Sequence, residues 1–382
     1  MNSAESRKYI IFREMKSQGK AWVSTVEKYL RLQKDLLKAL KDCSSIYFLG
    51  SGSSYNNALM AEFAYSKLLD RRAYSLNSSE YLFNPEAFRK PGRNDVIFII
   101  SRTGETSDTI YALDLLKDLE VKSENRSDGK SLNFITLTTF PESSIAKAGD
   151  LSVNFQDIKE KSITSNRVVS CITLFLLCLL FKLSGKELQV KKINGYSEKF
   201  FGQFDRYCQF ISEIINSMDF KKFIFLGTGP FCSVAREASL KTREMSISDT
   251  EFWPTLEYRQ GYMTNAQSAD LATVFLSRIN MDFQIKTCRE LKKIGAKVFV
   301  IGDGTGDAAG GRISGKTFYS SPNKKTGEKF YDFSLDINTG VEEELLLQVY
   351  YQLFGQLIGY WQALKKNVDP SNPQNLDYVV RI

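Results

Sequence analysis

The stretch Ile46-Tyr-Phe-Leu-Gly50-Ser-Gly52, an apolar run that ends in Gly-x-Gly, returns later in the chain as Phe223-Ile-Phe-Leu-Gly227-Thr-Gly229. A helix-like segment follows each copy, at about 57–68 and 233–245. A second pair lies at nearly the same spacing, since Val96-Ile-Phe-Ile-Ile-Ser101-Arg102 corresponds to Thr273-Val-Phe-Leu-Ser277-Arg278. The offsets of the two pairs differ by a single residue, and this agreement predicts an internal duplication.

Short apolar runs alternate with helical patterns in both halves. We expect strands at 46–49, 96–100, 133–137, 151–154, 223–226, 272–276, 297–301 and about 331–335, and helices at about 20–41, 106–118, 197–217 and 342–365. Such alternation is typical of parallel sheets covered by helices on both faces. The sequence therefore predicts an α/β fold with two tandem, doubly wound, three-layer domains over residues 1–190 and 191–382. A polar, lysine-rich linker is expected at 185–200.

The composition is that of an ordinary globular protein. The 382 residues are 43% hydrophobic and 25% charged, with a formal net charge of +7. The longest apolar run, Cys171 to Phe181, is far shorter than the ~20 residues of a membrane span, and the N-terminus has no signal-peptide core. We therefore expect a cytoplasmic protein that does not bind membranes. The mild positive charge suits an anionic small substrate and does not predict nucleic-acid binding.

Histidine is absent from the sequence. Imidazole-based zinc sites and Ser-His-Asp or Cys-His catalytic units are therefore excluded within this chain. The six cysteines are scattered without a CxxC pair, so we expect buried free thiols. We expect no metal ion and no organic cofactor.

Two hydroxyl-rich loops follow expected strands of the first half, Gly50-Ser-Gly-Ser-Ser54 and Ser101-Arg-Thr-Gly-Glu-Thr-Ser107. Ligands of doubly wound sheets bind beyond the carboxyl ends of the strands, and small residues, hydroxyl groups and helix N-termini suit a phosphate. Neither loop has the Walker lysine, and Tyr55 takes the place of the third glycine of a dinucleotide fingerprint. These turns could also be simple helix caps. We favour a phosphate site here, and not at the hydroxyl-poor loop 227–230 of the second half.

At these residues the sequence resembles the sugar isomerase (SIS) family, as two tandem SIS domains of flavodoxin-like topology over nearly the whole chain. The motifs are Gly50-Ser-Gly-Ser-Ser-Tyr55, Ser101-Arg-Thr-Gly-Glu-Thr106, Glu160-Lys-Ser-Ile-Thr-Ser165, Glu237-Ala-Ser-Leu-Lys-Thr-Arg-Glu244 and Asp369-Pro-Ser-Asn-Pro-Gln-Asn-Leu376. The chain is most similar to the AgaS-like group of tagatose-6-phosphate ketose/aldose isomerases and galactosamine-6-phosphate deaminase/isomerases. It is also similar to the isomerase half of glucosamine-6-phosphate synthase.

This resemblance implies an aldose–ketose isomerase that acts on a hexose 6-phosphate by proton transfer between C1 and C2. An amino sugar 6-phosphate, with hydrolytic release of ammonia, is the expected substrate. The resemblance further implies a homodimer or a higher homo-oligomer.

The resemblance also assigns roles to individual residues. The base falls on Glu244, with Lys241 one turn earlier on the same helix face; without the family, a surface ion pair would be the simpler interpretation. The sugar contacts fall on Ser53 and on the backbone around 163–165, including Ser165. The phosphate-binding positions fall on Ser54, Ser101, Arg102, Thr103 and Thr106.

The sequence departs from the family pattern at two positions. Where the family has an Arg/Lys-His-Gly-Pro segment, this chain has Arg259-Gln-Gly-Tyr262, so Gln260 replaces the histidine linked to ring opening. A glutamine can hydrogen-bond a ring oxygen but cannot shuttle a proton. Ring opening would then rely on Glu244, Glu257, Arg259, Tyr378 or water, or on the small open-chain fraction of the substrate. Tyr378 stands where the synthase branch has a tail lysine. The alternative function is therefore a catalytically impaired, sugar-phosphate-binding regulatory protein.

Overall fold

The computed structural model describes residues 8–92, 94–124, 132–186, 192–304 and 329–382, which form two compact units. The first unit contains Lys20–Val190 and Asn375–Ile382, and the second contains Lys191–Gln374 and the N-terminal stretch that ends at Gly19. These units differ at both ends from the expected ranges 1–190 and 191–382. The N-terminal stretch up to Gly19 belongs to the second unit, and Asn375–Ile382 belongs to the first. Much of the expected linker, 187–191, lies outside the described residues.

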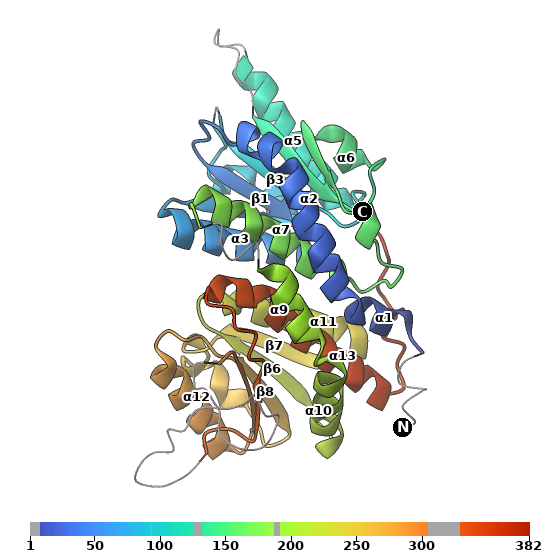
Figure 1. The fold of residues 1–382 in the computed structure, drawn as a ribbon, viewed down its shortest axis with the longest axis vertical. Helices are drawn as coiled ribbons and strands as arrows, with labels where there is room; N and C mark the ends of the chain where they lie inside the picture. The colour runs from blue at the N-terminus through green and yellow to red at the C-terminus, as the bar shows by residue number, and fades with distance from the viewer. Residues whose placement is uncertain (1–7, 93, 125–131, 187–191, 305–328) are drawn as a thin grey trace. The chain divides into compact units, whose positions relative to one another are not determined.

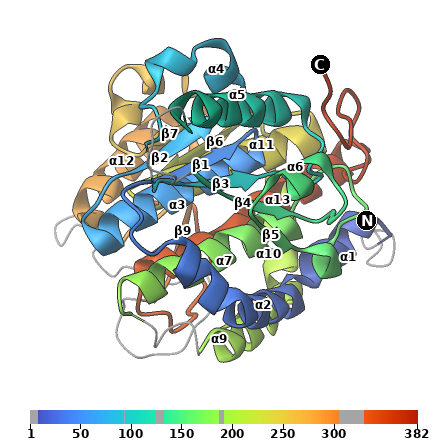
Figure 2. The same ribbon diagram turned by 90° about the horizontal axis from the view of Figure 1, so that it is seen from above.

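The centre of the first unit is a five-stranded parallel sheet (Figures 1 and 2) with the order β2-β1-β3-β4-β5. All residues of β1 and β3 are buried, as expected for strands covered on both faces. Helices α3 and α7 cover one face, and α4 and α5 cover the other (Figure 2). The strands are β1 (Ile46–Gly50), β2 (Ala73–Asn77), β3 (Val96–Ile100), β4 (Asn133–Thr138) and β5 (Leu151–Asn154).

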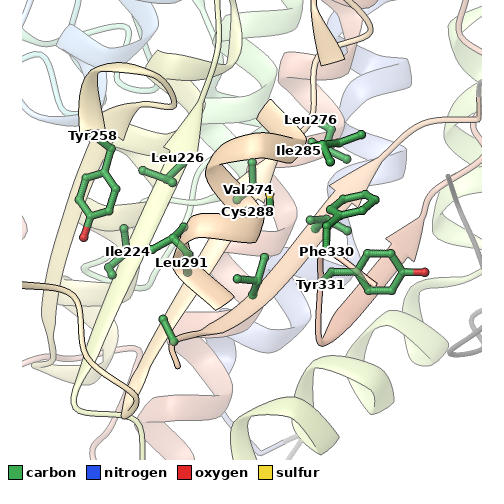
Figure 3. Close-up of a cluster of buried hydrophobic side chains, with 14 of the residues drawn as sticks. Ile224, Leu226, Tyr258, Val274, Leu276, Ile285, Cys288, Leu291, Phe330 and Tyr331 are labelled. Carbon is green, nitrogen blue, oxygen red and sulfur yellow. The ribbon is translucent and has the colours of Figure 1, made fainter. Parts of the chain in front are cut away.

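The second unit repeats this topology. Its parallel sheet has the order β10-β9-β8-β6-β7, which is the order of the first sheet when each set of strands is numbered from its own first strand. Strand residues such as Ile224 and Val274 pack against Ile285, Cys288 and Leu291 of α12 in one apolar cluster (Figure 3). The strands are β6 (Lys222–Gly227), β7 (Asp249–Pro254), β8 (Asp270–Phe275), β9 (Lys297–Gly302) and β10 (Phe333–Asp336).

The helices of the two units complete the layers. Those of the first unit, with α2 beginning just before its boundary, are α2 (Gln18–Ala39), α3 (Ser53–Leu69), α4 (Ser78–Phe83), α5 (Ser107–Glu124), α6 (Ser144–Ala148) and α7 (Arg167–Leu183). Those of the second unit are α1 (Ile10–Lys16), α9 (Ile193–Phe201), α10 (Phe204–Ser217), α11 (Phe231–Ser246), α12 (Met281–Ile294) and α13 (Leu347–Lys365). Short 3-10 helices lie at Pro85–Ala87, Gln156–Ile158, Glu257–Arg259, Tyr262–Asn265 and Glu344–Leu346.

The predicted fold class is confirmed, and all eight expected strands are present. Strands β2 and β7 were not predicted, because they carry partly exposed and polar residues and so lack a continuous apolar signal. The helix expected at 197–217 is divided into α9 and α10 by Gly202 and Gln203. The six cysteines are free thiols as expected, although Cys43 and Cys232 are only half-buried. Among the described residues, no helix is both long enough and apolar enough to cross a membrane.

Candidate functional site

Both hydroxyl-rich loops leave the sheet of the first unit at the same edge. Strands β1 and β3 pair directly, from Ile46 opposite Val96 onward, and the strand order reverses between them. This reversal is where doubly wound folds bind ligands. The loop after β1 leads into α3 at Ser53, and the loop after β3 leads into α5 at Ser107. The predicted binding residues Ser53, Ser54 and 101–106 are therefore gathered at one sheet edge.

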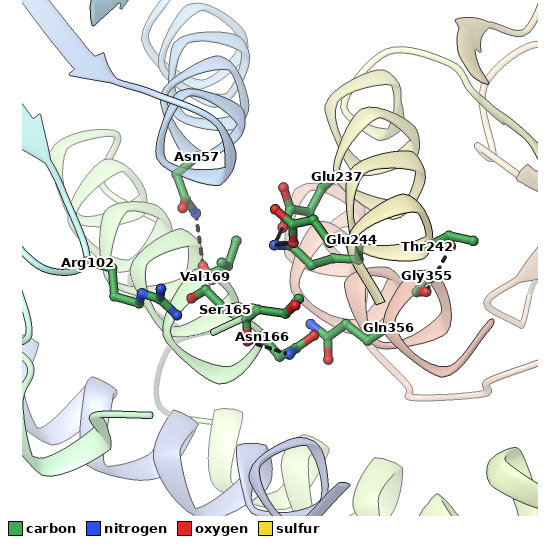
Figure 4. Close-up of polar contacts among 12 residues, drawn as sticks. Asn57, Arg102, Ser165, Asn166, Val169, Glu237, Thr242, Glu244, Gly355 and Gln356 are labelled. Carbon is green, nitrogen blue, oxygen red and sulfur yellow. Dashed lines mark hydrogen bonds and ion pairs between the residues drawn. The ribbon is translucent and has the colours of Figure 1, made fainter. Parts of the chain in front are cut away.

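The first of these helices is held firmly to its neighbour. Asn57 of α3 donates from Nδ2 to the Val169 carbonyl at 2.9 Å (Figure 4) and to Thr173 Oγ1 at 2.7 Å. Asn57 is buried, and both acceptors lie on α7. The buried amide thus fixes the start of α3, with Ser53 and Ser54, relative to the turn that precedes α7.

The loop after β3 is organised by its own hydroxyl groups. Ser101 is 2% exposed, and its Oγ accepts the Gly104 N–H at 3.1 Å and lies 3.3 Å from Thr106 Oγ1. Thr103 Oγ1 accepts the Glu105 N–H at 3.3 Å. Gly104 has φ +67°, and a Cβ there would lie 2.0 Å from Ser143 Oγ. The position therefore requires glycine, and the loop is shaped before any ligand arrives.

Arg102 carries a positive charge that no carboxylate in the described part of the chain neutralises. Its guanidinium donates to the carbonyls of Ser162 and Tyr378, both at 3.3 Å, and lies 4.3 Å from the centre of the Tyr378 ring. These contacts are with neutral groups, and 3.3 Å is long for hydrogen bonds of a charged donor. The guanidinium thus remains suited to an anionic ligand.

The turn before α7 contains a carboxylate whose role the sequence analysis did not identify. Glu160 is 1% exposed and accepts Ser165 Oγ at 3.0 Å and the N–H groups of Asn166 at 2.9 Å and Arg167 at 2.5 Å. An acidic group at a helix N-terminus is stabilised by the unpaired N–H groups there. Glu160 therefore shapes the segment expected to contact a sugar, and it accepts the hydrogen bond that the Ser165 hydroxyl donates. Its place at the head of the Glu160–Ser165 motif was the available signal.

The predicted base and its lysine come together on α11 of the second unit. Lys241 is 1% exposed, and its Nζ lies 2.6 Å from Glu244 Oε2 and 3.6 Å from Glu237 Oε1 (Figure 4). The side chain of Glu237 is 1% exposed, whereas that of Glu244 is 18% exposed. The buried ammonium therefore orients both carboxylates, and Glu244 is the one that solvent reaches. This geometry is unlike the flexible surface pair that was the alternative interpretation.

Helix α11 is held by close packing against α13. A Cβ placed on Gly355 would lie 2.4 Å from Ala238 Cβ, and one on Gly359 would lie 2.9 Å from Thr242 Cα. Thr242 Oγ1 donates to the Gly355 carbonyl at 3.3 Å (Figure 4). The two glycines let the helix backbones approach, so the carboxylates of α11 stand on a rigid element.

The two remaining candidates, Arg259 and Gln260, make their polar contacts with residues outside this carboxylate cluster. Arg259 forms a bidentate ion pair with Glu290 of α12, at 2.6 and 2.9 Å. Gln260 is exposed, and its N–H donates to the Glu257 carbonyl at 2.8 Å. The structure thus ties Arg259 to α12 rather than to Lys241 or Glu244.

Part of the first unit matches a known domain family. Residues 39–180, which include both loops of the first unit, match the SIS domain. The glutamine–fructose-6-phosphate aminotransferase (isomerizing) of Wigglesworthia glossinidia brevipalpis is 22% identical over 405 aligned positions, which cover 100% of this chain and 60% of that protein. The enzyme of the same description from Sulfolobus acidocaldarius is 23% identical, with 100% and 58% covered. The chain thus spans about three fifths of the length of these curated relatives.

Solved structures show the same fold over almost the whole chain. The tagatose-6-phosphate ketose/aldose isomerase of Escherichia coli superposes with a TM-score of 0.79 at 12% identity, covering 97% of this chain and 96% of that one. The glucosamine-6-phosphate deaminase of Thermotoga maritima has a TM-score of 0.67 at 23% identity, with 96% and 100% covered. Residues 39–180 of the first unit therefore match the SIS domain, as the resemblance implied, and the chain as a whole has the fold of these solved structures.

Proposed function

We propose that this protein is an aldose–ketose isomerase of a hexose 6-phosphate, and that its substrate is an amino sugar 6-phosphate from which ammonia is released. The observation that carries the proposal is the loop of Ser101 to Thr106, with its hydroxyl groups and its arginine free of any carboxylate partner among the described residues. Preorganised hydroxyl groups and one cation match the needs of a phosphate dianion. In this proposal Ser54, Ser101, Arg102, Thr103 and Thr106 bind the phosphate.

Glu244 is the proposed base, and Lys241 is its positioning partner. The carboxylate removes the proton from C2 of the open-chain aldose while O1 gains a proton. It then returns its proton to C1 while the O2 hydroxyl loses its own proton, which leaves a carbonyl carbon at C2. When C2 carries an amino group, the same shift produces a ketimine, which water hydrolyses to the ketose phosphate and ammonia. The reaction requires no oxidant or reductant. The 2.6 Å contact with buried Lys241 holds the base in one orientation.

The test is an incubation of the protein with galactosamine 6-phosphate and glucosamine 6-phosphate, with ammonia and ketose 6-phosphate measured together. We expect both products in equal amounts. Glu244→Gln should abolish turnover, a loss of at least about a hundredfold, and should leave phosphosugar binding in place. Glu213→Gln, at an exposed carboxylate of α10, is the matched control and should react normally. Full activity of Glu244→Gln would disprove its role.

A regulatory protein that binds a phosphosugar without turnover is the second candidate. It is favoured by one observation: the family histidine is replaced by Gln260, whose side chain is exposed and cannot shuttle a proton. In that case hexose 6-phosphates would raise the melting temperature, and neither product would form.

We also propose that the protein assembles as a homodimer or a larger homo-oligomer, in keeping with its implied family. Light scattering coupled to size-exclusion chromatography tests this directly, and a mass of one chain at micromolar concentration would contradict it.

A further inference from the structure

We propose that Tyr378 is a positioning residue that holds the guanidinium of Arg102 over the phosphate loop, and that it thereby sets the affinity of the first unit for a phosphate group. This inference rests on the proposed function, because it concerns the same loop. Tyr378 belongs to the tail segment Asn375–Ile382, which is part of the first unit.

The tyrosine contacts both the loop and its surroundings. The guanidinium carbon of Arg102 lies 4.3 Å from the ring centre, and Arg102 also donates to the Tyr378 carbonyl. The hydroxyl of Tyr378 donates to the Glu160 carbonyl at 2.9 Å. The ring meets Phe140 edge to face, with 6.4 Å between the ring centres. The tyrosine is therefore fixed from two sides while its face is turned to the arginine.

The tail is also tied down beyond Tyr378. The Ser107 N–H, at the start of α5, donates to the Val380 carbonyl at 3.3 Å, and the Ile382 N–H donates to Ser107 Oγ at 3.3 Å. The tail is thus anchored at Glu160, at Arg102 and at the end of the phosphate loop itself. A tail held at these points keeps the ring in register with Arg102.

An aromatic face is well suited to this task. It attracts the cation by its quadrupole and restricts the arginine rotamers, yet it consumes none of the guanidinium N–H donors. The two carbonyl acceptors are neutral and 3.3 Å away, so a phosphate dianion can replace them with shorter, charge-assisted bonds. Without the ring, binding must also order a free arginine side chain, and this ordering costs affinity.

The experiment measures the affinity for inorganic phosphate and for glucosamine 6-phosphate by calorimetry in a set of Tyr378 and Arg102 variants. Tyr378→Leu should weaken both affinities about three- to thirtyfold, the range of a cation–π contact. Tyr378→Phe keeps the ring and should stay within about threefold of the wild type. In turnover assays, Tyr378→Leu should raise KM more than it lowers kcat.

The Arg102→Ala background separates positioning from a general structural effect. If Tyr378 acts through Arg102, Tyr378→Leu should weaken phosphate binding no further once the arginine is gone. Equal weakening in both backgrounds, or full affinity of the Tyr378→Leu single variant, would overturn the inference. Absence of phosphate and phosphosugar binding in the wild type would instead overturn the proposed function, and this inference with it. Circular dichroism and melting temperatures establish that each variant is folded.

Discussion

Arg102 and Arg278 stand at corresponding positions of the duplicated pattern, each just after a serine at the carboxyl end of a central strand, but their surroundings are opposite. Arg102 meets two carbonyls and a tyrosine ring. Arg278 donates to Asp303 Oδ2 at 2.8 Å and to the carbonyls of Val341 and Glu342, both at 2.8 Å. One arginine keeps its charge available, and the other has been neutralised by the protein.

A carboxylate also occupies the serine hydroxyl and the arginine N–H of the second loop. In the second unit Glu344 Oε1 accepts Ser277 Oγ at 2.8 Å and the Arg278 N–H at 2.6 Å. The serine N–H is occupied in both units, by Gln284 Oε1 at 2.9 Å for Ser277 and by the Leu137 carbonyl at 3.1 Å for Ser101. Glu344 thus occupies donors of the kind that an anion would use. The duplicated scaffold therefore supplies two equivalent loops, and the residues placed around each loop decide whether it can accept an external anion.

The backbone geometry is shared even where the chemistry differs. Gly104 with φ +67° and Asn280 with φ +50° occupy matching places in the two loops. At the edge strands, Asn154 accepts the Gln156 N–H at 2.7 Å, and Asp336 accepts the Asn338 N–H at 2.9 Å. Substitutions at these paired positions test how the two units differ.

The largest effect is expected from removing the two arginines separately. Arg278→Ala leaves Asp303, whose side chain is 2% exposed, without its cation, so the free energy of unfolding should fall by about 2 to 3 kcal/mol. Arg102→Ala removes only neutral contacts and should cost less than about 1 kcal/mol, while phosphate binding is weakened but still measurable. Urea denaturation and calorimetry measure the two quantities. Loss of phosphate binding in Arg278→Ala, with Arg102→Ala unaffected, would reverse the assignment.

A smaller effect is expected at the left-handed residue of each loop. Gly104→Ala places a Cβ against Ser143 at positive φ, so we expect a loss of about 2 kcal/mol in the free energy of unfolding and weaker phosphate binding. Asn280→Gly is the matched control and should change stability by less than about 0.5 kcal/mol, because both residues tolerate this conformation. Thermal and urea denaturation of the pair test this. Equal stability of the two variants would show that the Ser143 contact relaxes at little cost.

The smallest effect concerns the edge-strand pair and depends on pH. Burial raises the pKa of Asp336 to about 6, so the folded state takes up the proton more readily than the unfolded state. The stability associated with this group is fully present below pH ~4 and is lost as the pH rises through ~6. Asp336→Asn copies Asn154 of the first unit. It should be more stable than the wild type by about 1 kcal/mol at pH 7, after allowance for partial exposure, and the gain should vanish near pH 4. A gain that persists unchanged at pH 4 would assign the effect to packing.

How far the sequence predicts the fold depends on the burial of each element. Strands such as β1 and β3 are fully buried runs of β-branched and aromatic residues, so their positions could be predicted to within about one residue. Strand β2, Ala73-Tyr-Ser-Leu-Asn77, is partly exposed and resembles a loop in composition. Strand β7 contains Glu251 and ends at Pro254, so its sequence also lacks the apolar pattern of a buried strand.

The candidate site shows the same division between near and distant partners. The hydroxyl groups of Ser101, Thr103 and Thr106 lie within one loop, so the sequence itself indicated them. The pair of Lys241 and Glu244 lies within one turn of helix, but its role was implied only by the family resemblance. The partner of Arg259 was not predicted, because Glu290 lies 31 residues away on another helix. The cap formed by Glu160 was not predicted either, because it exists only when the turn before α7 brings this carboxylate to the N–H groups of Asn166 and Arg167.

The sequence by itself determined that two doubly wound units are present and that hydroxyl-rich loops follow two central strands of the first, because apolar periodicity and local turn chemistry act over a few residues. The tertiary structure decided which loop keeps a free cation. Asp303 and Glu344 come to the Arg278 loop from 25 and 66 residues away, and Tyr378 reaches Arg102 from 276 residues away. Charge neutralisation depends on distance in space, and only the folded chain sets that distance.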